Sequence, residues 1–100
     1  MFYVGNVLWF SDKQETIPDQ FTGIVYQSYS QGFMSDYMAW YKDGKLHRDE
    51  NSLEGDGPAR IYFHITFLDW DPSGLGHFRS GKKCQYWING VLINTERISI

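Results

Sequence analysis

The chain has 100 residues, of which 12 are Asp or Glu and nine are Lys or Arg, and its formal net charge at pH 7 is −3. This length fits one domain spanning residues 1–100. The negative charge argues against a broad surface for nucleic acid, so direct nucleic-acid binding is not expected, although Arg79, Lys82 and Lys83 form a local basic cluster. No apolar run approaches the roughly 20 residues of a membrane-spanning helix, and no membrane partner is expected.

The residue types favour β structure in a reducing compartment. Aromatic residues make up 18% of the chain, and these large side chains have high strand preference. The single Cys84 cannot form an internal disulfide, and an unpaired thiol is better tolerated where the compartment is reducing. We therefore expect a cytosolic protein of the mainly β class.

Alternating apolar and polar residues predict the strands. The clearest strand covers residues 59–68, where Ala, Ile and Phe on one face alternate with a mixed set on the other. Further strands, bounded by Gly, Pro, Asp, Asn or Ser, are expected at residues 2–10, 21–29, 36–42, 83–88 and 91–100. The sequence allows one short helical turn within residues 11–20, where Ser11 could cap the first turn before Pro18.

Two segments share an aromatic pair followed by a turn dipeptide. Residues 40–47 read WYKDGKLH and residues 86–93 read YWINGVLI. Asp-Gly and Asn-Gly suit the two-residue type I′ turn, so each copy predicts a β-hairpin. A fainter copy at residues 9–12 keeps the aromatic pair and the acid but is followed by Lys13 in place of Gly, which predicts a degraded terminal unit.

A family resemblance rests on three segments: FTGIVY at residues 21–26, WYKDGKLHR at 40–48 and DGPA at 56–59. They resemble the MORN-variant repeats of bacteria and the related WYxDGKLHRxDGPA repeats of phage and large-virus proteins, over roughly residues 19–93. The resemblance implies an antiparallel sheet of consecutive β-hairpins, with about two and a half MORN-like repeats and without catalytic residues. It also implies that the sheet serves as a binding scaffold.

Two insertions depart from the repeat pattern. Residues 49–55 stand where the simpler motif has about one residue, and residues 69–80 interrupt the second hairpin. Extra loops are where a repeat protein most often acquires specificity, whereas neutral growth of solvated loops is the alternative, because closure entropy rises slowly with length. The candidate partner-binding residues are Asp49, Glu50, Glu54, Asp56, Asp69, Trp70, Asp71 and Phe78.

Catalytic and metal-binding interpretations find little support. The carboxylates of residues 49–56 are oxygen ligands of the kind that Ca²⁺ or Mg²⁺ uses, but their spacing does not match an EF-hand loop, and no CxxC or HxxxH spacing for Zn²⁺ exists. The three His residues, and Cys84 as a nucleophile, belong to no recognised catalytic motif. His47 is part of the repeat signature, so we expect it to make a structural hydrogen bond that closes the hairpin against residues 56–59. No catalytic, cofactor-binding or metal-binding residue is predicted.

Small size, acidity and the lack of a catalytic motif favour a protein-binding module. Together with the resemblance to phage repeats, they suggest a phage-encoded inhibitor of a host defence system, similar to an anti-CRISPR, that occludes a functional surface of its target in the host cytosol. Carboxylates along a loop can face the Lys/Arg-lined groove of a nucleic-acid-handling defence complex. The alternatives are a self-assembling structural or accessory phage protein, which would form a homodimer or larger oligomer, and a small metal-dependent hydrolase.

Overall fold

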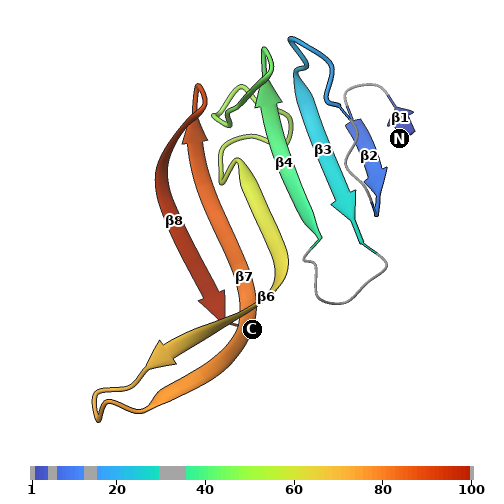
Figure 1. Cartoon of the computed structure of the whole chain (residues 1–100). Helices are drawn as coiled ribbons and strands as arrows, with labels where there is room; N and C mark the ends of the chain where they lie inside the picture. The colour runs from blue at the N-terminus through green and yellow to red at the C-terminus, as the bar shows by residue number, and fades with distance from the viewer. Residues whose placement is uncertain (1, 5–6, 13–15, 30–35, 100) are drawn as a thin grey trace.

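The computed structural model describes residues 2–4, 7–12, 16–29 and 36–99. These ranges contain eight strands and no helix, which confirms the expected mainly β class, and none of them forms a helix that could cross a membrane (Figure 1). The strands are β1 (Phe2–Val4), β2 (Val7–Ser11), β3 (Gly23–Ser28), β4 (Tyr37–Lys42), β5 (Lys45–Leu46), β6 (Arg60–Trp70), β7 (Gly76–Ile88) and β8 (Val91–Ser99). One sheet holds them in the order β1-β2-β3-β4-β6-β7-β8, and β5 pairs with β4.

Both predicted hairpin turns are present. Asp43 and Gly44, between β4 and β5, have φ of 52° and 80°, and Asn89 and Gly90, between β7 and β8, have φ of 48° and 80°. Positive φ at both central positions is the signature of the type I′ turn, whose twist matches that of the flanking strands. The Asp-Gly and Asn-Gly dipeptides therefore form these two hairpins as the sequence predicts.

The N-terminal part differs from the predicted row of hairpins. β1 and β2 form an antiparallel pair where the sequence predicts one strand over residues 2–10. β2 then pairs in parallel with β3, so the faint repeat at residues 9–12 is not followed by a hairpin. A parallel pair needs a crossover. Asp12 and residues 16–22 are the described part of that crossover and contain no helix, and residues 13–15 of the expected helical turn lie outside the described residues.

β5 and β6 occupy one position in the sheet. Both are antiparallel to β4, β5 along one half of it and β6 along the other. Between them, His47 N donates to Trp40 O (3.1 Å) and Trp40 N donates to Ala59 O (2.7 Å), which continues the ladder. Residues 49–58, called here the 49–58 loop, therefore leave the sheet after β5 and return to the same line at β6.

Apolar side chains pack on both faces of the sheet in two clusters. The first cluster contains Leu8, Phe10, Phe21 and Val25. The second contains Ile24, Met38 and Trp40. Ile24 and Val25 are consecutive strand residues and point to opposite faces. The crossover covers the first cluster through Phe21, and the 49–58 loop covers the second at Trp40.

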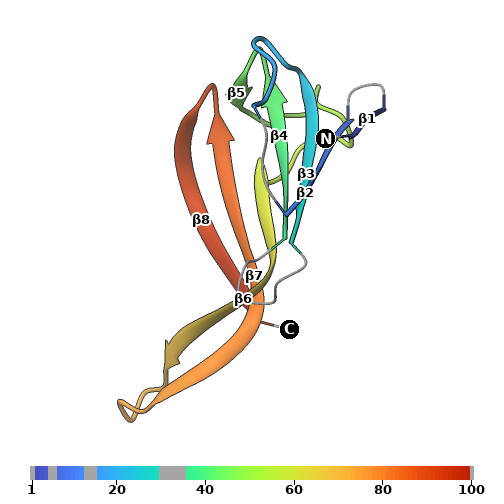
Figure 2. The ribbon, with the colours of Figure 1, turned by 45° about the vertical axis from the view of Figure 1, so that its right-hand side comes forward.

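The β6–β7 hairpin extends beyond the rest of the sheet as a two-stranded arm, residues 65–81 (Figures 1 and 2). The register shifts between Tyr62 and Ile65, where the arm begins, and such bulges increase local twist. At the other strand, Gly81 lies so close to β8 that a Cβ atom there would be 2.0 Å from the Ile98 oxygen. A bulge and a glycine together mark the point where the arm leaves the sheet.

The arm corrects the prediction for residues 69–80, which the sequence presents as an irregular insertion. β6 runs to Trp70 and β7 begins at Gly76, so most of the insertion is paired strand and only residues 71–75 form the turn. The insertion lengthens a hairpin because added residues on both strands continue the same antiparallel ladder.

Replacing Gly81 with Ala should destabilise the fold, because the added methyl group overlaps a backbone oxygen of β8. The free energy of unfolding should fall by about 1–3 kcal/mol or more, because overpacked sites typically lose this much. Urea unfolding followed by Trp fluorescence measures it. The control is Ser80→Ala at the exposed neighbouring position, which should change stability by less than about 0.5 kcal/mol. Equal stability of the two variants would contradict the close approach of β7 and β8.

Candidate protein-binding surfaces

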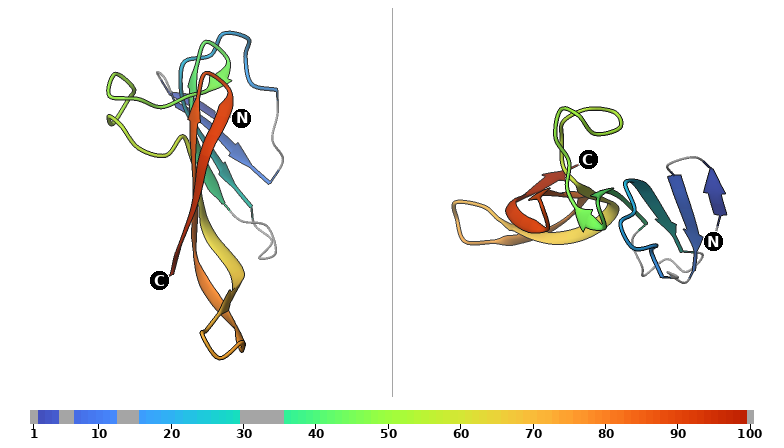
Figure 3. Two further views of the ribbon diagram at one scale, coloured as in Figure 1. Left: turned by 90° about the vertical axis from the view of Figure 1, so that its left-hand side faces the viewer. Right: turned by 90° about the horizontal axis from the view of Figure 1, so that it is seen from above.

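The residues predicted to bind a partner lie in the 49–58 loop and in the arm. The loop stands out from one face of the sheet near the β4–β5 turn (Figure 3), and the arm projects at the opposite end (Figures 1 and 2). The eight candidate residues therefore form two separate groups of four, and they do not assemble one site.

Arg48 holds the 49–58 loop at its N-terminal end. Its guanidinium donates hydrogen bonds to the backbone oxygens of Gly55 (2.7 Å), Pro58 (3.2 Å) and Glu54 (3.3 Å). Its Cζ atom also lies 3.7 Å from the centroid of the Trp40 ring, which is a cation–π contact. One side chain thus satisfies three backbone oxygens of the loop and fixes them against the sheet.

Trp40 and Gly57 complete this arrangement. Trp40 Nε1 donates to the Leu53 oxygen (2.9 Å), and the Trp40 side chain is only 3% exposed. A Cβ atom at Gly57 would lie 3.0 Å from Arg48 Cζ, and the φ of 154° at this residue also favours Gly. Trp40, Arg48 and Gly57 therefore fix the loop.

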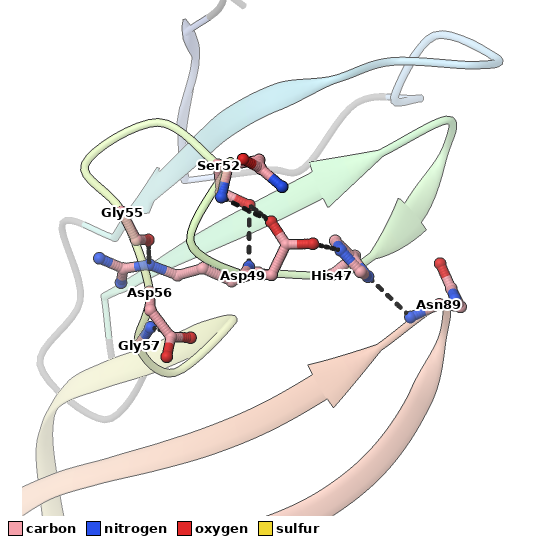
Figure 4. Close-up of polar contacts among 9 residues, drawn as sticks. His47, Asp49, Ser52, Gly55, Asp56, Gly57 and Asn89 are labelled. Carbon is pink, nitrogen blue, oxygen red and sulfur yellow. Dashed lines mark hydrogen bonds and ion pairs between the residues drawn. The ribbon is translucent and has the colours of Figure 1, made fainter.

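His47 uses both ring nitrogens inside the fold (Figure 4). Its Nδ1 accepts a hydrogen bond from Asn89 N (3.0 Å), and its Nε2 lies 2.8 Å from Asp49 Oδ2. Because Nδ1 is an acceptor, the proton is on Nε2, which donates to the carboxylate. The ring connects the loop to the turn between β7 and β8, so the expected hydrogen bond toward residues 56–59 is wrong. Both ring nitrogens are thus engaged in hydrogen bonds within the fold.

The four carboxylates of the loop divide into two kinds. Asp49 accepts hydrogen bonds from His47 and from a backbone N–H two residues on, and these bonds lower the pKa of Asp49. Asp56 accepts from the backbone N–H of the next residue (2.9 Å). Glu50 and Glu54 are exposed. Asp49 and Asp56 therefore shape the loop, whereas the two Glu side chains present negative charge to solvent.

A cavity of about 410 Å³ lies between the 49–58 loop and the end of β4. Trp40 and Leu53 are among its lining residues. The volume is in the range of small-ligand sites. The lining also combines Asp43 and Asp49 with Lys42, and this mixture of charges does not single out a ligand class.

The arm has one apolar face. On it Leu68 pairs with Phe78, and Trp70 pairs with Gly76. The Trp70 ring covers the space that a side chain at Gly76 would fill, since a Cβ atom there would lie 3.2 Å from it. Phe78 is nevertheless 80% exposed and Trp70 64% exposed. Cross-strand pairing thus orders aromatic side chains that remain open to solvent.

The opposite face of the arm is ionic. Asp69 Oδ2 lies 2.9 Å from Arg79 Nε, and Asp71 Oδ2 lies 3.1 Å from His77 Nε2. Exposed pairs of this kind contribute little to stability, because solvent screens the attraction between the charges. The two carboxylates predicted to bind a partner are therefore engaged within the arm, and Trp70 and Phe78 remain its contact candidates.

The other reactive side chains do not form a site. Cys84 is 6% exposed, and burial, with a further contribution from Glu96, raises the pKa of its thiol and disfavours the nucleophilic thiolate. His64 is exposed on β6. In the part of the chain that the structure describes, no group of three His, Cys, Asp or Glu residues could hold a metal ion.

Two features of these surfaces have weak sequence signals. Leu68 and Leu75 are further exposed apolar residues of the arm, at 44% and 64%; alternation with Asp69 and Trp70 signals Leu68, whereas Leu75 lies in the turn and has no such signal. Arg48 belongs to the segment WYKDGKLHR, but its role depends on three carbonyl groups that come together only when the loop closes, so the segment does not reveal it.

Comparison of the chain with protein-family models, curated proteins and solved structures found no significant match. The repeat resemblance therefore rests on residues 21–26, 40–48 and 56–59 alone. Of what it implies, the mainly β class and the two type I′ hairpins are present in the structure.

Replacing Arg48 with Met should destabilise the protein by about 2–3 kcal/mol, because three backbone oxygens lose a charged donor. The amides of Ser52 and Gly55 should also exchange faster with deuterium, since their loop is no longer fixed. The control is Arg79→Met, which removes only an exposed ion pair and should cost less than about 1 kcal/mol. A smaller effect for Arg48 than for Arg79 would contradict the role assigned to Arg48.

Replacing Ser73 with Ala should raise the pKa of Asp71. The bond from Ser73 Oγ (2.6 Å) and the one from His77 are the main causes that lower this pKa from 3.8 to about 2. A pKa lowered by folding means that the ionised carboxylate stabilises the turn above pH 3.8, and that this contribution is lost as the pH falls through 2. Titration of the Asp71 carboxyl carbon by NMR measures the midpoint, and an unchanged midpoint in the variant would refute this account of the turn.

Proposed function

We propose that the chain is a protein-binding module without catalysis. It engages a protein partner through the apolar face of the arm and through Glu50 and Glu54 of the 49–58 loop. As a finer proposal, the partner is a component of a host defence system, and the chain inhibits it by occluding a functional surface in the host cytosol.

The arm carries this proposal. Trp70 and Phe78 are large aromatic side chains at 64% and 80% exposure, held on a paired hairpin that projects from the sheet. Aromatic anchors of this kind dominate the binding energy of protein interfaces, because they bury much area and lose little entropy. Their pairing with Leu68 and Gly76 keeps that entropy loss small, since the arm is already ordered before binding.

The 49–58 loop supports the chemistry proposed for the partner. The hydrogen bonds that shape the loop use the carboxylates of Asp49 and Asp56, whereas the side chains of Glu50 and Glu54 are exposed to solvent. Exposed carboxylates complement a Lys/Arg-lined surface and accelerate association with it. Nucleic-acid-handling proteins carry such surfaces, and this is the basis for proposing a defence complex as the target.

Self-assembly is the second candidate function, and β8 favours it. All nine residues of this edge strand are exposed, including Val91 at 61% and Ile93 at 63%. An open strand edge with apolar residues can pair with another chain. Size-exclusion chromatography with light scattering separates the two candidates: a stable oligomer that Val91→Ser dissociates would favour assembly over binding of a host protein.

Affinity purification from a bacterial lysate, with this protein as bait, tests the binding function. We expect recovery of a defence nuclease or one of its subunits, and a loss of affinity of more than about tenfold for Phe78→Ser. Val91→Ser, which replaces an exposed apolar residue of β8 outside the arm, is the control and should bind normally. Glu50→Gln with Glu54→Gln should slow association more at low salt than at high salt. Recovery of virion proteins alone would contradict the inhibitor proposal.

A further inference from the structure

The pairing register gathers three cationic residues on the face of the sheet opposite the 49–58 loop. Arg60 pairs with Ala39, the neighbour of Trp40, so its side chain points away from the face that carries the loop. Lys83 and Arg97 pair with each other in the adjacent row. We call Arg60, Lys83 and Arg97 the basic cluster.

Two cross-strand rows contain the basic cluster. From β4 to β8 they read Tyr37–Tyr62–Lys83–Arg97 and Ala39–Arg60–Gln85–Thr95. Neither row contains Asp or Glu. Glu96, the acidic residue of β8, pairs with Cys84 and lies on the other face, where it raises the pKa of Tyr86 after the larger effect of burial. The three positive charges therefore have no carboxylate in their own rows.

Aromatic rings surround the centre of this cluster. Arg60 Cζ lies 5.6 Å from the centroid of Tyr37, 5.9 Å from that of Tyr62 and 5.8 Å from that of Trp87. Lys83 Nζ lies 4.5 Å from the centroid of Tyr62. These side chains are all half-buried, so they belong to the surface of the sheet and not to its packed clusters. Cations interleaved with aromatic rings on a sheet are the arrangement that binds single-stranded nucleic acid.

Buried donors at this cluster lack acceptors among the described residues. Arg60 Nη1 donates to Tyr62 Oη (3.2 Å), but Arg60 Nε and Trp87 Nε1 have no partner. Gln85 Oε1, directly opposite Arg60, is also unpaired, so a rotation of Gln85 could satisfy Nε and would leave the Trp87 N–H without an acceptor. An unpaired buried donor is costly, and an oxygen-rich anion supplies acceptors of the kind this cluster lacks.

We propose that this face binds single-stranded nucleic acid, with the basic cluster at the phosphates and the rings of Tyr62 and Trp87 against the bases. An acidic peptide would match the cations but would leave the rings without a planar partner. An open sheet face also accommodates a flexible strand without a preformed groove. The proposal is independent of the protein partner proposed above, because it uses the opposite face of the sheet.

The net charge does not oppose this inference, because the charges are segregated. The basic cluster in the sequence, Arg79, Lys82 and Lys83, is not the one that forms in the fold. Lys82 points to the opposite face from Lys83, and Arg79 is paired with Asp69. The basic cluster of the fold therefore shares only Lys83 with the group in the sequence, and its other members, Arg60 and Arg97, are distant from Lys83 along the chain.

Fluorescence anisotropy of a labelled oligo-dT of about 12 nucleotides tests the proposal. We expect saturable binding. The logarithm of the association constant should fall with the logarithm of the salt concentration at a slope of about −2 between roughly 50 and 200 mM NaCl, as three phosphate contacts require. Lys83→Ala and Arg97→Ala should each weaken binding and flatten the slope by about 0.7. Tyr62→Leu should weaken binding with little change of slope.

The matched control is Lys82→Ala, which removes the same charge from the neighbouring residue on the opposite face and should leave affinity and slope unchanged. Absence of saturable binding at about 50 mM salt would overturn the proposal, as would equal losses for Lys82→Ala and Lys83→Ala. Displacement of the oligonucleotide by poly-glutamate as effectively as by unlabelled oligo-dT, with no effect of Tyr62→Leu, would identify a general polyanion surface and would also overturn it. Circular dichroism confirms that each variant retains the sheet.

Discussion

The guanidinium of Arg48 is the interaction on which the loop face depends. Arg48 lies two residues after the end of β5, and its own N–H donates to Trp87 O (3.3 Å), so the side chain is placed over Trp40 before the loop begins. Ordering a loop costs about 1–2 kcal/mol per residue in backbone entropy, whereas a hydrogen bond to a charged donor contributes about 1.5–3 kcal/mol. Three such bonds can offset only part of that cost, which is why His47 and the Trp40 indole also bind the loop.

The β4–β5 hairpin also contacts the turn between β7 and β8. His47 accepts from Asn89 N, and Leu46 O accepts from Gly90 N (2.8 Å), so the end of β5 is joined to the turn of the second hairpin. In repeat architectures each unit is stabilised mainly by its neighbour. His47 therefore joins the two hairpins, and this contact accounts for the residue without a catalytic role.

Local sequence patterns were sufficient to predict the hairpin turns, because the backbone conformation of a turn depends on its own residues. Asp43 and Asn89 precede Gly in dipeptides that adopt positive φ, so both hairpins could be predicted. Two parts of the fold depend on contacts between distant residues: the parallel pairing of β2 with β3 and the paired strands of the arm. Alternation of apolar and polar residues does not indicate which strand pairs with which. Asp69 and Asp71 illustrate the limit for the site: their type suggested a partner, while their cross-strand neighbours Arg79 and His77 engage them within the arm.

Register also explains how an acidic chain presents faces of opposite charge. Lys82 and Lys83 are neighbours in sequence yet face opposite sides of β7, and Glu96 and Arg97 do the same on β8. Side chains on the two faces of a sheet point in opposite directions, and the Debye length at physiological salt is about 8 Å. Charges on one face therefore act weakly on a ligand bound at the other. The net charge of −3 describes neither face, so an acidic loop on one side and a basic cluster on the other can coexist in one small chain.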